Sequence, residues 1–375
     1  MQLINEGKAK IKIANDSKIS RKLPVFYNPV MKLNRDITIL LLNAVDKSDM
    51  QMALPLAGTG IRGIRFFLEL NEEKIRALYL NDFKIEKVLD NLKLNEIDSD
   101  KIITSGKDAN MFLLENKGFD YIDIDPFGSP NPFLENSIVR LARDGILAVT
   151  ATDTAALSGS SKDACQRKYW AKPLRNELMH ELGIRILIRK VQLIGAQNDK
   201  ALIPIFSYSK DHYFKIFFRC SKGKKKVDEL FNRHNYLLYN NTTCEMHIIR
   251  DILDIKAGNT LEISSENALE NKFDYAGPLW TGKLWDEKLV KKMKGLVDKE
   301  QNEIYDKKLR DLIDVIAEES KIDCVGFYDP HKLVKLRKIK MPKTSDLLGK
   351  EVVRTHFVPW AVKSKLSVDE VFKIK

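Results

Sequence analysis

The chain has 375 residues, which is long for a single domain and makes two domains the natural expectation. With 44% hydrophobic and 31% charged residues, its composition excludes a disordered or collagen-like chain. The formal net charge of +11 favours a polyanionic partner, although charge alone leaves that question open.

The cysteines argue against disulfides and against a four-cysteine zinc site. Cys165, Cys220, Cys244 and Cys324 lie far apart and include no Cys-x-x-Cys pair. The N-terminus lacks a signal-peptide core, and no apolar run approaches the ~18 residues needed to cross a membrane. These features predict a cytoplasmic protein with no membrane association.

The first 155 residues alternate between helical and strand patterns. An apolar helix is expected at Asp36–Lys47, and a strand, a glycine turn and a helix follow in "MALPLAGTGIRGIRFFLEL". "IRALYLND", "KIITSGKDA", "FDYIDID" and "ILAVTATD" are the next strands, separated by helices that include Phe83–Leu94 and "PFLENSIVRLARDG". Strands that alternate with helices at this spacing predict a doubly wound parallel sheet of the α/β class.

The sequence pattern changes from about Arg185, where strand-like segments follow one another. "IRILIRKVQLIG", "LIPIFSYS" and "HYFKIFFRC" are typical of further strands, and the basic run Ser221–Glu229 indicates a break. We therefore expect one domain over residues 1–221 and a smaller α+β domain over residues 227–375.

Four predicted strands end in residues suited to a nucleoside. The turn "AGTGIRG" allows close backbone approach, Asp82 follows at the distance of a ribose-binding acid, and Asp108 with the Ala109 N–H would read an adenine. Each acid taken singly is also an ordinary loop acid. The pattern by itself does not separate NAD from S-adenosylmethionine, and phosphate binding is not required because the turn is not a clean GxGxxG.

Three arginines flank this turn. Arg62 and Arg65 fall in the first turns of the following helix, and Arg35 lies just before the preceding one. Each suits a carboxylate or phosphate of the ligand, and each is also compatible with a surface role.

The fourth strand runs into "DIDPFGSP", which is either a structural turn or an acceptor site for an amino group. The Asp125 carboxylate and the Pro126 carbonyl would hold the N–H groups of an exocyclic amine, whose lone pair is delocalised into the ring. Phe127 would stack on the base, and Gly128 leaves room for it.

The ordered motifs "VFYNPVMKLNRD", "AGTGIRGIRF", "IDIDPFGSP", "LAVTATDTAAL", "CQRKY", "AGPLWTG" and "RTHF" are similar to those of the archaeal-type tRNA (guanine(26)-N2)-dimethyltransferases. The resemblance covers nearly the whole chain. It implies a class I, Rossmann-like methyltransferase domain, a C-terminal tRNA-binding domain, and transfer of one or two methyl groups from S-adenosylmethionine to guanine N2 in tRNA.

The resemblance also implies site residues. Arg35, Arg65, Asp82, Asp108 and Ala109 match methyl-donor contacts, with Arg62 less clearly so, and Asp125 matches the catalytic acid. Phe127 and Phe26 match aromatic positions that sandwich the guanine. Many relatives carry two Cys-x-x-Cys pairs that this chain lacks, and Cys244 with His247 cannot close a tetrahedral site, so we expect no metal.

A basic segment at His331–Lys343 contains no acid and is expected to run as an extended strand face along phosphates. Its relevant cations are Lys335, Arg337, Lys338 and Lys340, and Lys222–Lys226 would add to them. No obligate protein partner is indicated.

Three other functions remain compatible with parts of this pattern. They are an amino methyltransferase acting on another RNA or DNA base, a non-catalytic tRNA-binding folding factor, and a nicotinamide-dependent oxidoreductase. The intact strand-end acids disfavour the second, and the missing GxGxxG disfavours the third.

Overall fold

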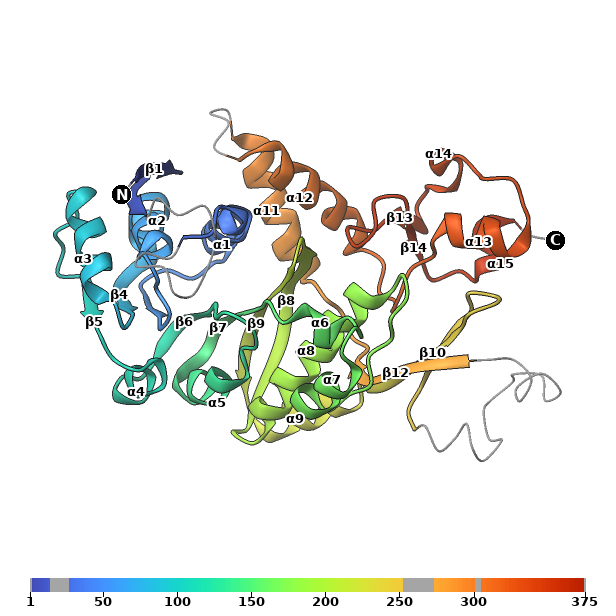
Figure 1. Ribbon diagram of the computed structural model, residues 1–375, viewed down its shortest axis with the longest axis horizontal. Coiled ribbons are helices and arrows are strands. Elements are labelled where there is room, and N and C mark those ends of the chain that lie inside the picture. Colours follow the sequence, from blue (N-terminus) through green and yellow to red (C-terminus); the bar gives the residue numbers. More distant parts are fainter. Residues whose placement is uncertain (1, 14–26, 252–272, 301–304, 374–375) are drawn as a thin grey trace. The chain divides into compact units, whose positions relative to one another are not determined.

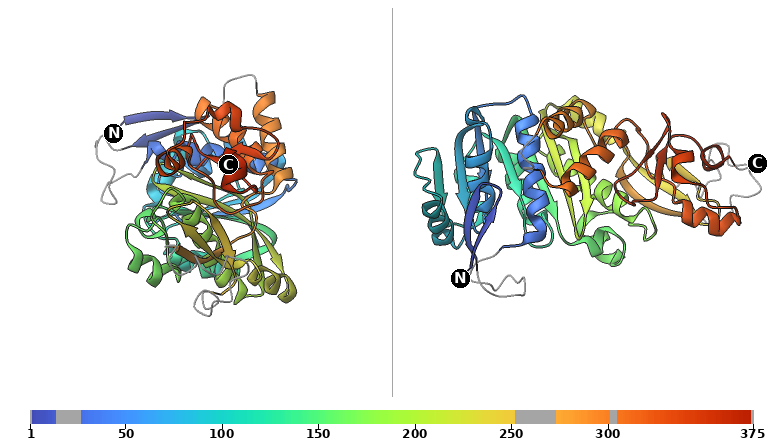
Figure 2. Two further views of the ribbon diagram at one scale, coloured as in Figure 1. Left: turned by 90° about the vertical axis from the view of Figure 1, so that its right-hand side faces the viewer. Right: turned by 90° about the horizontal axis from the view of Figure 1, so that it is seen from above.

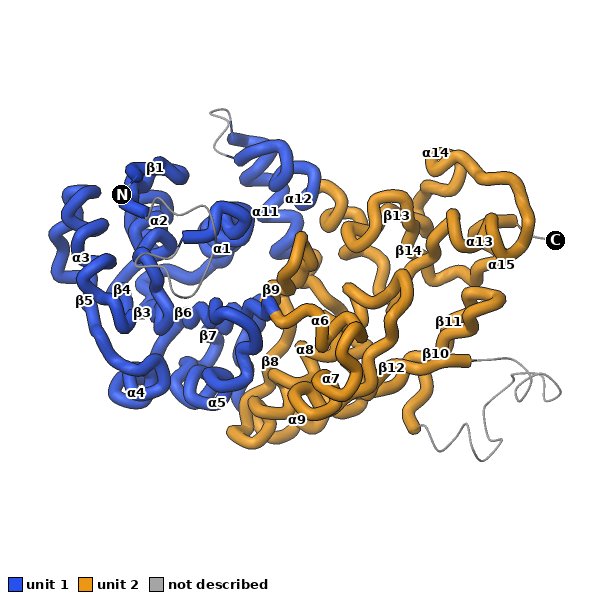
Figure 3. The backbone as a smooth tube through the Cα atoms, viewed as in Figure 1, with its two compact units in different colours: residues 1–152, 217–222, 288–313 blue, residues 153–216, 223–287, 314–375 orange. Residues whose placement is uncertain are grey.

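The computed structural model describes residues 2–13, 27–251, 273–300 and 305–373. Two compact units are assembled from separate stretches of the chain (Figure 3). Unit 1 contains residues 1–152, 217–222 and 288–313, and unit 2 contains residues 153–216, 223–287 and 314–375. The division into domains 1–221 and 227–375 stays a prediction.

The predicted parallel sheet is present, and its strands pair in the order β5-β4-β3-β6-β7, with β9 and β8 completing the sheet (Figure 1). The strands are β3 (Met50–Leu54), β4 (Ile75–Asn81), β5 (Ile102–Ser105), β6 (Phe119–Ile124), β7 (Leu141–Ala151), β8 (Lys200–Lys210) and β9 (Tyr213–Lys222). The chain moves outward from β3 to β5 and returns on the other side of β3 as β6. This reversal creates a topological switch point, where such sheets bind ligands.

Helices connect these strands at the expected places, except that the last five residues of the predicted helix "PFLENSIVRLARDG" belong to β7. They are α1 (Lys32–Ala44), α2 (Ile61–Glu69), α3 (Ile85–Leu94), α4 (Ala109–Glu115) and α5 (Asn131–Arg140), with short 3-10 turns at Pro29–Met31 and Glu72–Lys74. Helix α1 begins at Lys32 and not at Asp36, because the turn at Pro29 leads directly into it. Unit 1 also contains α11 (Glu287–Lys299) and the first part of α12 (Lys307–Glu319).

An N-terminal hairpin, which the sequence patterns did not indicate, packs on two of these helices (Figure 2). It consists of β1 (Gln2–Glu6) and β2 (Ala9–Ile13). Backbone N–H groups of Lys8, Lys10 and Lys12 donate to side chains of α2 and of the α3 end, namely Glu69, Asn95 and Asn91. The hairpin therefore brings the Glu6 side chain next to α1 and α2.

The prediction of a strand at Arg185–Gly195 is wrong, because the segment lies within helix α8 (Met179–Ala196). Helix α8 packs against β8 and β12 (Phe273–Trp280) within unit 2, so its side chains are buried on most sides. A helix buried on all sides has no polar stripe, and its apolar run imitates a buried strand.

The basic segment is also not extended. Residues Pro330–Arg337 form helix α13, capped by the Asp329 side chain, which accepts a hydrogen bond from the His331 N–H. Pro330 occupies the first helical turn, where its missing N–H costs nothing. Most of the expected break at Ser221–Glu229 is likewise helical, as part of α9 (Lys224–Phe231), which buries Val227 and Leu230.

The remaining elements of unit 2 are short. They are α6 (Thr154–Leu157), α7 (Lys162–Tyr169), β10 (His234–Asn240), β11 (Met246–Ile249), α14 (Thr344–Leu347), β13 (Val352–Arg354), β14 (Val362–Ser364) and α15 (Val368–Phe372). Strand β10 lies between β11 and β12, and β13 pairs with β14. Among the described residues, no helix is both long and apolar enough to span a bilayer.

A buried ion-pair network joins distant parts of unit 2. The Lys363 ammonium on β14 lies 2.8 Å from Glu181 of α8 and 3.8 Å from Glu319 of α12. Arg185 also pairs with Glu181, and Glu319 accepts from the His356 backbone N–H. Burial alone would raise the pKa of Glu181, but Lys363 and Arg185 lower it to about 2.

We expect Lys363→Met to lower the free energy of unfolding of unit 2 by about 3 kcal/mol, because it leaves buried carboxylates short of a cation. Chemical denaturation checks this. The matched control is Lys321→Met, which removes an exposed pair with Glu318 and should cost under about 1 kcal/mol. Equal losses in the two variants would contradict the role given to Lys363.

Candidate functional site

The glycine turn after β3 and the acid after β4 lie in direct contact. Gly58 and Gly60 have φ angles of 61° and 80°, which other residues adopt only with strain. The Gly58 N–H donates to Asp82 Oδ2 at 2.9 Å. The other Asp82 oxygen accepts from the Lys84 N–H. Asp82 is thus held at the carboxyl edge of the sheet, facing the turn, as the nucleoside prediction requires.

Asn81 joins three strand ends and was not singled out from the sequence. Its buried amide donates to the carbonyls of Pro55 and Lys107 and accepts from the Lys107 N–H. The loops after β3 and β5 are therefore tied to the end of β4. An Asn directly before an acid at a strand end is the only sequence signal for this role.

Asp108 caps the helix that follows β5. Its carboxylate accepts hydrogen bonds from the N–H groups of Asn110 and Met111. Asp108 is exposed to solvent, whereas Ala109 is buried. The first turn of α4 is therefore presented at the same edge of the sheet as Asp82. The adenine contact of Asp108 and Ala109 stays a prediction.

The stretch after β6 is anchored by β7. The Gly128 N–H donates to Thr152 Oγ1 at 2.6 Å, and the Thr152 N–H donates to the Gly128 carbonyl at 3.0 Å. Gly128 has a φ of 93°, which favours glycine. The Phe127 side chain is 40% exposed and Pro126 is buried. Thr152, in the "TATDTA" segment, thus shapes the loop that carries Asp125.

Arg62 contacts the two carboxylates of β6 and its following loop. Its Nη2 lies 2.5 Å from Asp125 and its Nη1 lies 3.3 Å from Asp123. The same guanidinium donates to Asn34 and Thr38 of α1. Asp123 is buried and also accepts from the Tyr121 hydroxyl, whose pKa is raised by burial and by the Asp123 charge. Arg62 therefore faces the predicted catalytic acid.

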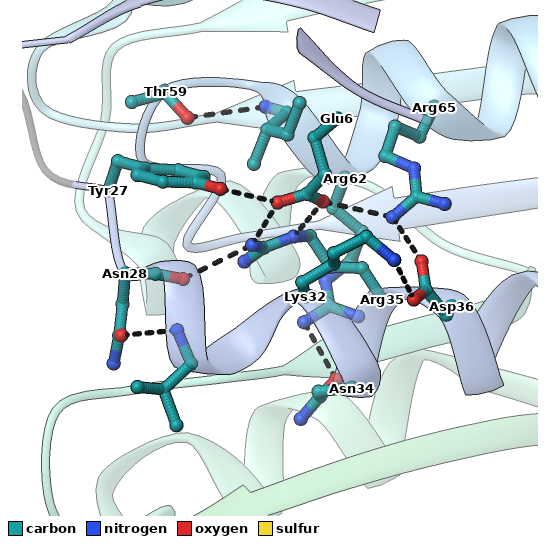
Figure 4. A network of polar contacts seen from close by, with 12 residues as sticks. Glu6, Tyr27, Asn28, Lys32, Asn34, Arg35, Asp36, Thr59, Arg62 and Arg65 are labelled. Atoms are coloured by element: carbon teal, nitrogen blue, oxygen red, sulfur yellow. Dashed lines mark hydrogen bonds and ion pairs between the residues drawn. The ribbon is translucent and has the colours of Figure 1, made fainter. Parts of the chain in front are cut away.

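Arg35 and Arg65 belong to a second buried network, centred on Glu6 (Figure 4). Arg35 donates through Nε and Nη2 to both Glu6 oxygens, at 2.6 and 2.5 Å. Arg65 lies 2.9 Å from Glu6, 2.7 Å from Asp36 and 2.8 Å from Glu69. The hairpin therefore supplies a carboxylate to arginines that are predicted to face the donor.

This network shifts the acidity of its members. Burial would raise the pKa of Glu6, but hydrogen bonds and charge from Arg35, with help from Arg65, lower it to about 2. Tyr27 donates to Glu6, and burial together with the nearby carboxylate raises the pKa of Tyr27 to about 12. Glu6 is therefore a permanent anion at neutral pH.

Phe26 lies outside the described residues, so its predicted stacking role stays a prediction. Sequence reasoning missed Phe83, which follows Asp82 and is 73% exposed, a high value for an aromatic side chain at a strand end. It also missed Glu6, because no local pattern shows that a terminal hairpin reaches the site.

Cys165 is fully buried, and burial followed by the Asp153 charge raises its pKa to about 12. A thiol in this state is a packing group and not a nucleophile at neutral pH. Within the described ranges, no cluster of three or more His, Cys, Asp or Glu side chains is suited to a metal ion.

Known proteins are similar to this chain over its whole length. Residues 7–375 match the family described as N2,N2-dimethylguanosine tRNA methyltransferase. The tRNA (guanine(26)-N(2)/guanine(27)-N(2))-dimethyltransferase of Aquifex aeolicus is 41% identical over 100% of this chain and 95% of its own. The tRNA (guanine(26)-N(2))-dimethyltransferase of Methanocaldococcus jannaschii is 34% identical over 99% and 97%.

A solved structure gives the same picture. Trm1 from Pyrococcus horikoshii with S-adenosyl-L-methionine aligns with a TM-score of 0.84 and 33% identity, covering 100% of this chain and 99% of that one. This whole-length similarity confirms the predicted class I α/β fold.

The acid stability of the protein should report on Glu6. Because its pKa is about 4.5 when unfolded and about 2 when folded, the unfolded chain binds the proton more readily between these values. The stabilisation from Glu6 is therefore complete above pH 4.5 and is lost as the pH falls toward 2.

Glu6→Gln should lower the thermal midpoint at neutral pH, and the midpoint of this variant should decline less steeply as the pH is lowered. The exposed Glu72→Gln should keep the wild-type slope, and an unchanged slope in Glu6→Gln would contradict the network.

Proposed function

Because this chain belongs to the N2,N2-dimethylguanosine tRNA methyltransferase family, we propose that it transfers one or two methyl groups from S-adenosylmethionine to the exocyclic N2 of guanine 26 in tRNA. The observation that carries this proposal is the Asp125–Gly128 loop at the switch point, next to the glycine turn and Asp82. We further propose the cytoplasm as the compartment and tRNA as the partner.

The residues after β3, β4 and β5 fit the nucleoside end of the donor. Asp82 would accept the ribose hydroxyls, since its carboxylate is oriented by the Gly58 and Lys84 N–H groups. Asp108 and the Ala109 N–H would read the adenine edge. The exposed Phe83 ring would cover an adenine face, because it stands beside Asp82 at the strand end.

Arg35 and Arg65 would meet the methionine end. Both already contact Glu6, so a donor carboxylate would have to share these guanidiniums with it. Arginine forks present several donors and can serve two carboxylates at once. The Glu6 anion would also attract the ammonium group of the donor.

S-adenosylmethionine supplies an electrophilic methyl group when it is bound. The chain must orient a weak nucleophile toward it, because the guanine amino lone pair is delocalised into the ring. The Asp125 carboxylate and the Pro126 carbonyl would accept the two N–H groups, and the 40% exposed Phe127 ring would stack on the base. Asp125 would then take the proton that the methylated nitrogen releases.

A second transfer needs only one acceptor. After the first methyl group is attached, a single N–H remains, and either oxygen can hold it. A guanine that is stacked within the tRNA must leave the stack to reach this loop.

Arg62 is better suited to hold Asp125 than to bind the donor. Its guanidinium contacts Asp123 and Asp125 on one side and Asn34 and Thr38 of α1 on the other. A guanidinium whose Nη2 lies 2.5 Å from Asp125 keeps the Asp125 oxygens aimed in one direction. We propose this positioning role in place of the donor contact that the sequence predicts.

Asp125→Ala should lower kcat for tRNA methylation by roughly 100-fold or more, because the amino group loses its charged acceptor. Donor binding, measured by calorimetry, should stay within about threefold, a change under 1 kcal/mol. The control is Asp120→Asn on the same strand, whose carboxylate pairs with Lys47 at the opposite end. Retained turnover in Asp125→Ala would refute the catalytic role.

Arg62→Gln separates its two possible roles. If it positions Asp125, kcat should fall roughly 10- to 100-fold, the worth of a charged hydrogen bond, with donor Kd unchanged. Asp82→Ala is the reference for lost donor binding, and Arg76→Gln, an exposed arginine paired with Asp49, should change neither quantity. A raised donor Kd with unaltered kcat in Arg62→Gln would favour the donor contact.

The function itself is tested with labelled S-adenosylmethionine and unmodified tRNA transcripts that carry guanine or adenine at position 26. Incorporation should require the guanine, and primer extension should stop there, since N2,N2-dimethylguanine blocks pairing. Mapping of position 27 in the same products shows whether the neighbouring base is modified. Incorporation that ignores the base at 26 and 27 would point to another target.

A further inference from the structure

Trp170 stands in an unusual backbone conformation on the surface of unit 2. It ends helix α7 with φ 55° and ψ 40°, the left-handed region that glycine prefers at this position. A bulky non-glycine residue is rare there, and its ring is nevertheless 47% exposed. A strained and partly exposed aromatic side chain raises the question of a ligand.

A cation lies against one face of this ring. Lys190 Nζ is 3.0 Å from the Trp170 ring centroid, and the lysine itself is buried. Burial and the neighbouring Arg189 lower the pKa of Lys190 to about 8, so it remains charged at neutral pH. The ammonium covers one face of the ring and 47% of the residue is exposed, so a ligand would have to approach Trp170 from the side opposite Lys190.

Further aromatic rings and cations lie near Trp170 in unit 2. Arg189 Nη1 donates to the Trp170 carbonyl at 3.3 Å, and burial lowers the pKa of this arginine while the nearby Tyr236 raises it. Tyr236 meets Tyr275 edge to face at 6.3 Å. Lys172 Nζ lies 3.5 Å from the Tyr275 ring centroid. We call this the aromatic–basic face: Trp170, Lys172, Arg189, Lys190, Tyr236 and Tyr275.

The charge of this face favours an anion. Its three cations have one acidic partner among the contacts described, Asp274, which is 2.9 Å from Lys172, so the six residues and this partner carry a net charge of +2 (three minus one). The side chains of Arg167 and Arg175 are exposed close by in the sequence. Interleaved rings and cations are the features that bind unstacked nucleotides, the rings taking bases and the cations taking phosphates.

We propose that the aromatic–basic face binds the tRNA substrate, with a nucleobase stacked on the face of Trp170 opposite Lys190 and phosphates at Lys172 and Arg189. Lys190, on the far side of the ring, adds cation–π attraction that holds the indole flat beneath the base. The inference rests on the proposed function for the identity of the RNA, and it adds a second contact region that no catalytic residue shares.

Trp170→Gly tests the stacking contact without harm to the backbone, because glycine suits a φ of 55°. The thermal midpoint should therefore not fall. The Kd for an unmodified tRNA transcript, measured by filter binding without donor, should rise roughly 5- to 100-fold, the usual worth of a base–aromatic stack. Trp170→Phe should retain most of the affinity. The KM for tRNA should rise while donor Kd and kcat at saturating tRNA stay at wild-type values.

Trp360→Ala is the matched control. Trp360 is also 47% exposed in unit 2. Its Nε1–H donates to Asp329 and its ring contacts His331, so Trp360 is not part of the aromatic–basic face. Unchanged tRNA affinity in Trp170→Gly, or an equal loss in Trp360→Ala, would overturn the proposal.

The phosphate contacts are tested separately, by the salt dependence of tRNA binding. Lys172→Met should reduce the slope of log Kd against log salt by about one, whereas Trp170→Gly should weaken binding by the same factor at every salt concentration. An unaltered slope in Lys172→Met would remove that lysine from the site. Because binding is measured without methyl transfer, a wild-type protein that binds tRNA but methylates nothing would refute the proposed function and leave this result standing.

Discussion

The buried guanidinium of Arg62 is the constraint on which the candidate site depends. It reaches from the first turn of α2 to two side chains of α1, Asn34 and Thr38, and to two carboxylates at the end of β6. A planar group with several fixed donors can satisfy all four partners at once, which a lysine cannot do. The same atoms that join two helices to the sheet therefore also aim the Asp125 carboxylate.

A second buried charge cluster joins β1, α1 and α2. Glu6, Asp36 and Glu69 are matched by Arg35, Arg65 and Lys32, so the cluster is neutral although nearly all of it is buried. Such pairs are expensive to desolvate and would be costly to leave incomplete. The N-terminal hairpin must therefore be in place for Arg35 and Arg65 to be held, although it is a short peripheral element.

Local sequence patterns were sufficient to predict the secondary structure where the chain alternates between buried strands and amphipathic helices. The strands from β3 to β6 were predicted close to their observed bounds, because buried parallel strands and turn glycines leave strong local signals, whereas β7 begins five residues before its predicted start. The patterns failed at α8, whose residues are apolar on most sides, and at α13, where interleaved basic and apolar residues imitated a strand. In α13 the capping Asp329 and Pro330 were the overlooked signals.

By itself, the sequence determined the α/β class, the family, and which residue types stand at the strand ends, because these depend on period, spacing and turn chemistry within short stretches. It named Asp82, Asp108 and Asp125 for that reason. Tertiary structure alone decided the partners of those residues. Three contacts form between segments that are distant in sequence. They are Arg62 with Asp125, Glu6 with Arg35, and Lys190 with Trp170. Such contacts follow from packing and charge compensation between elements, and no local period encodes them.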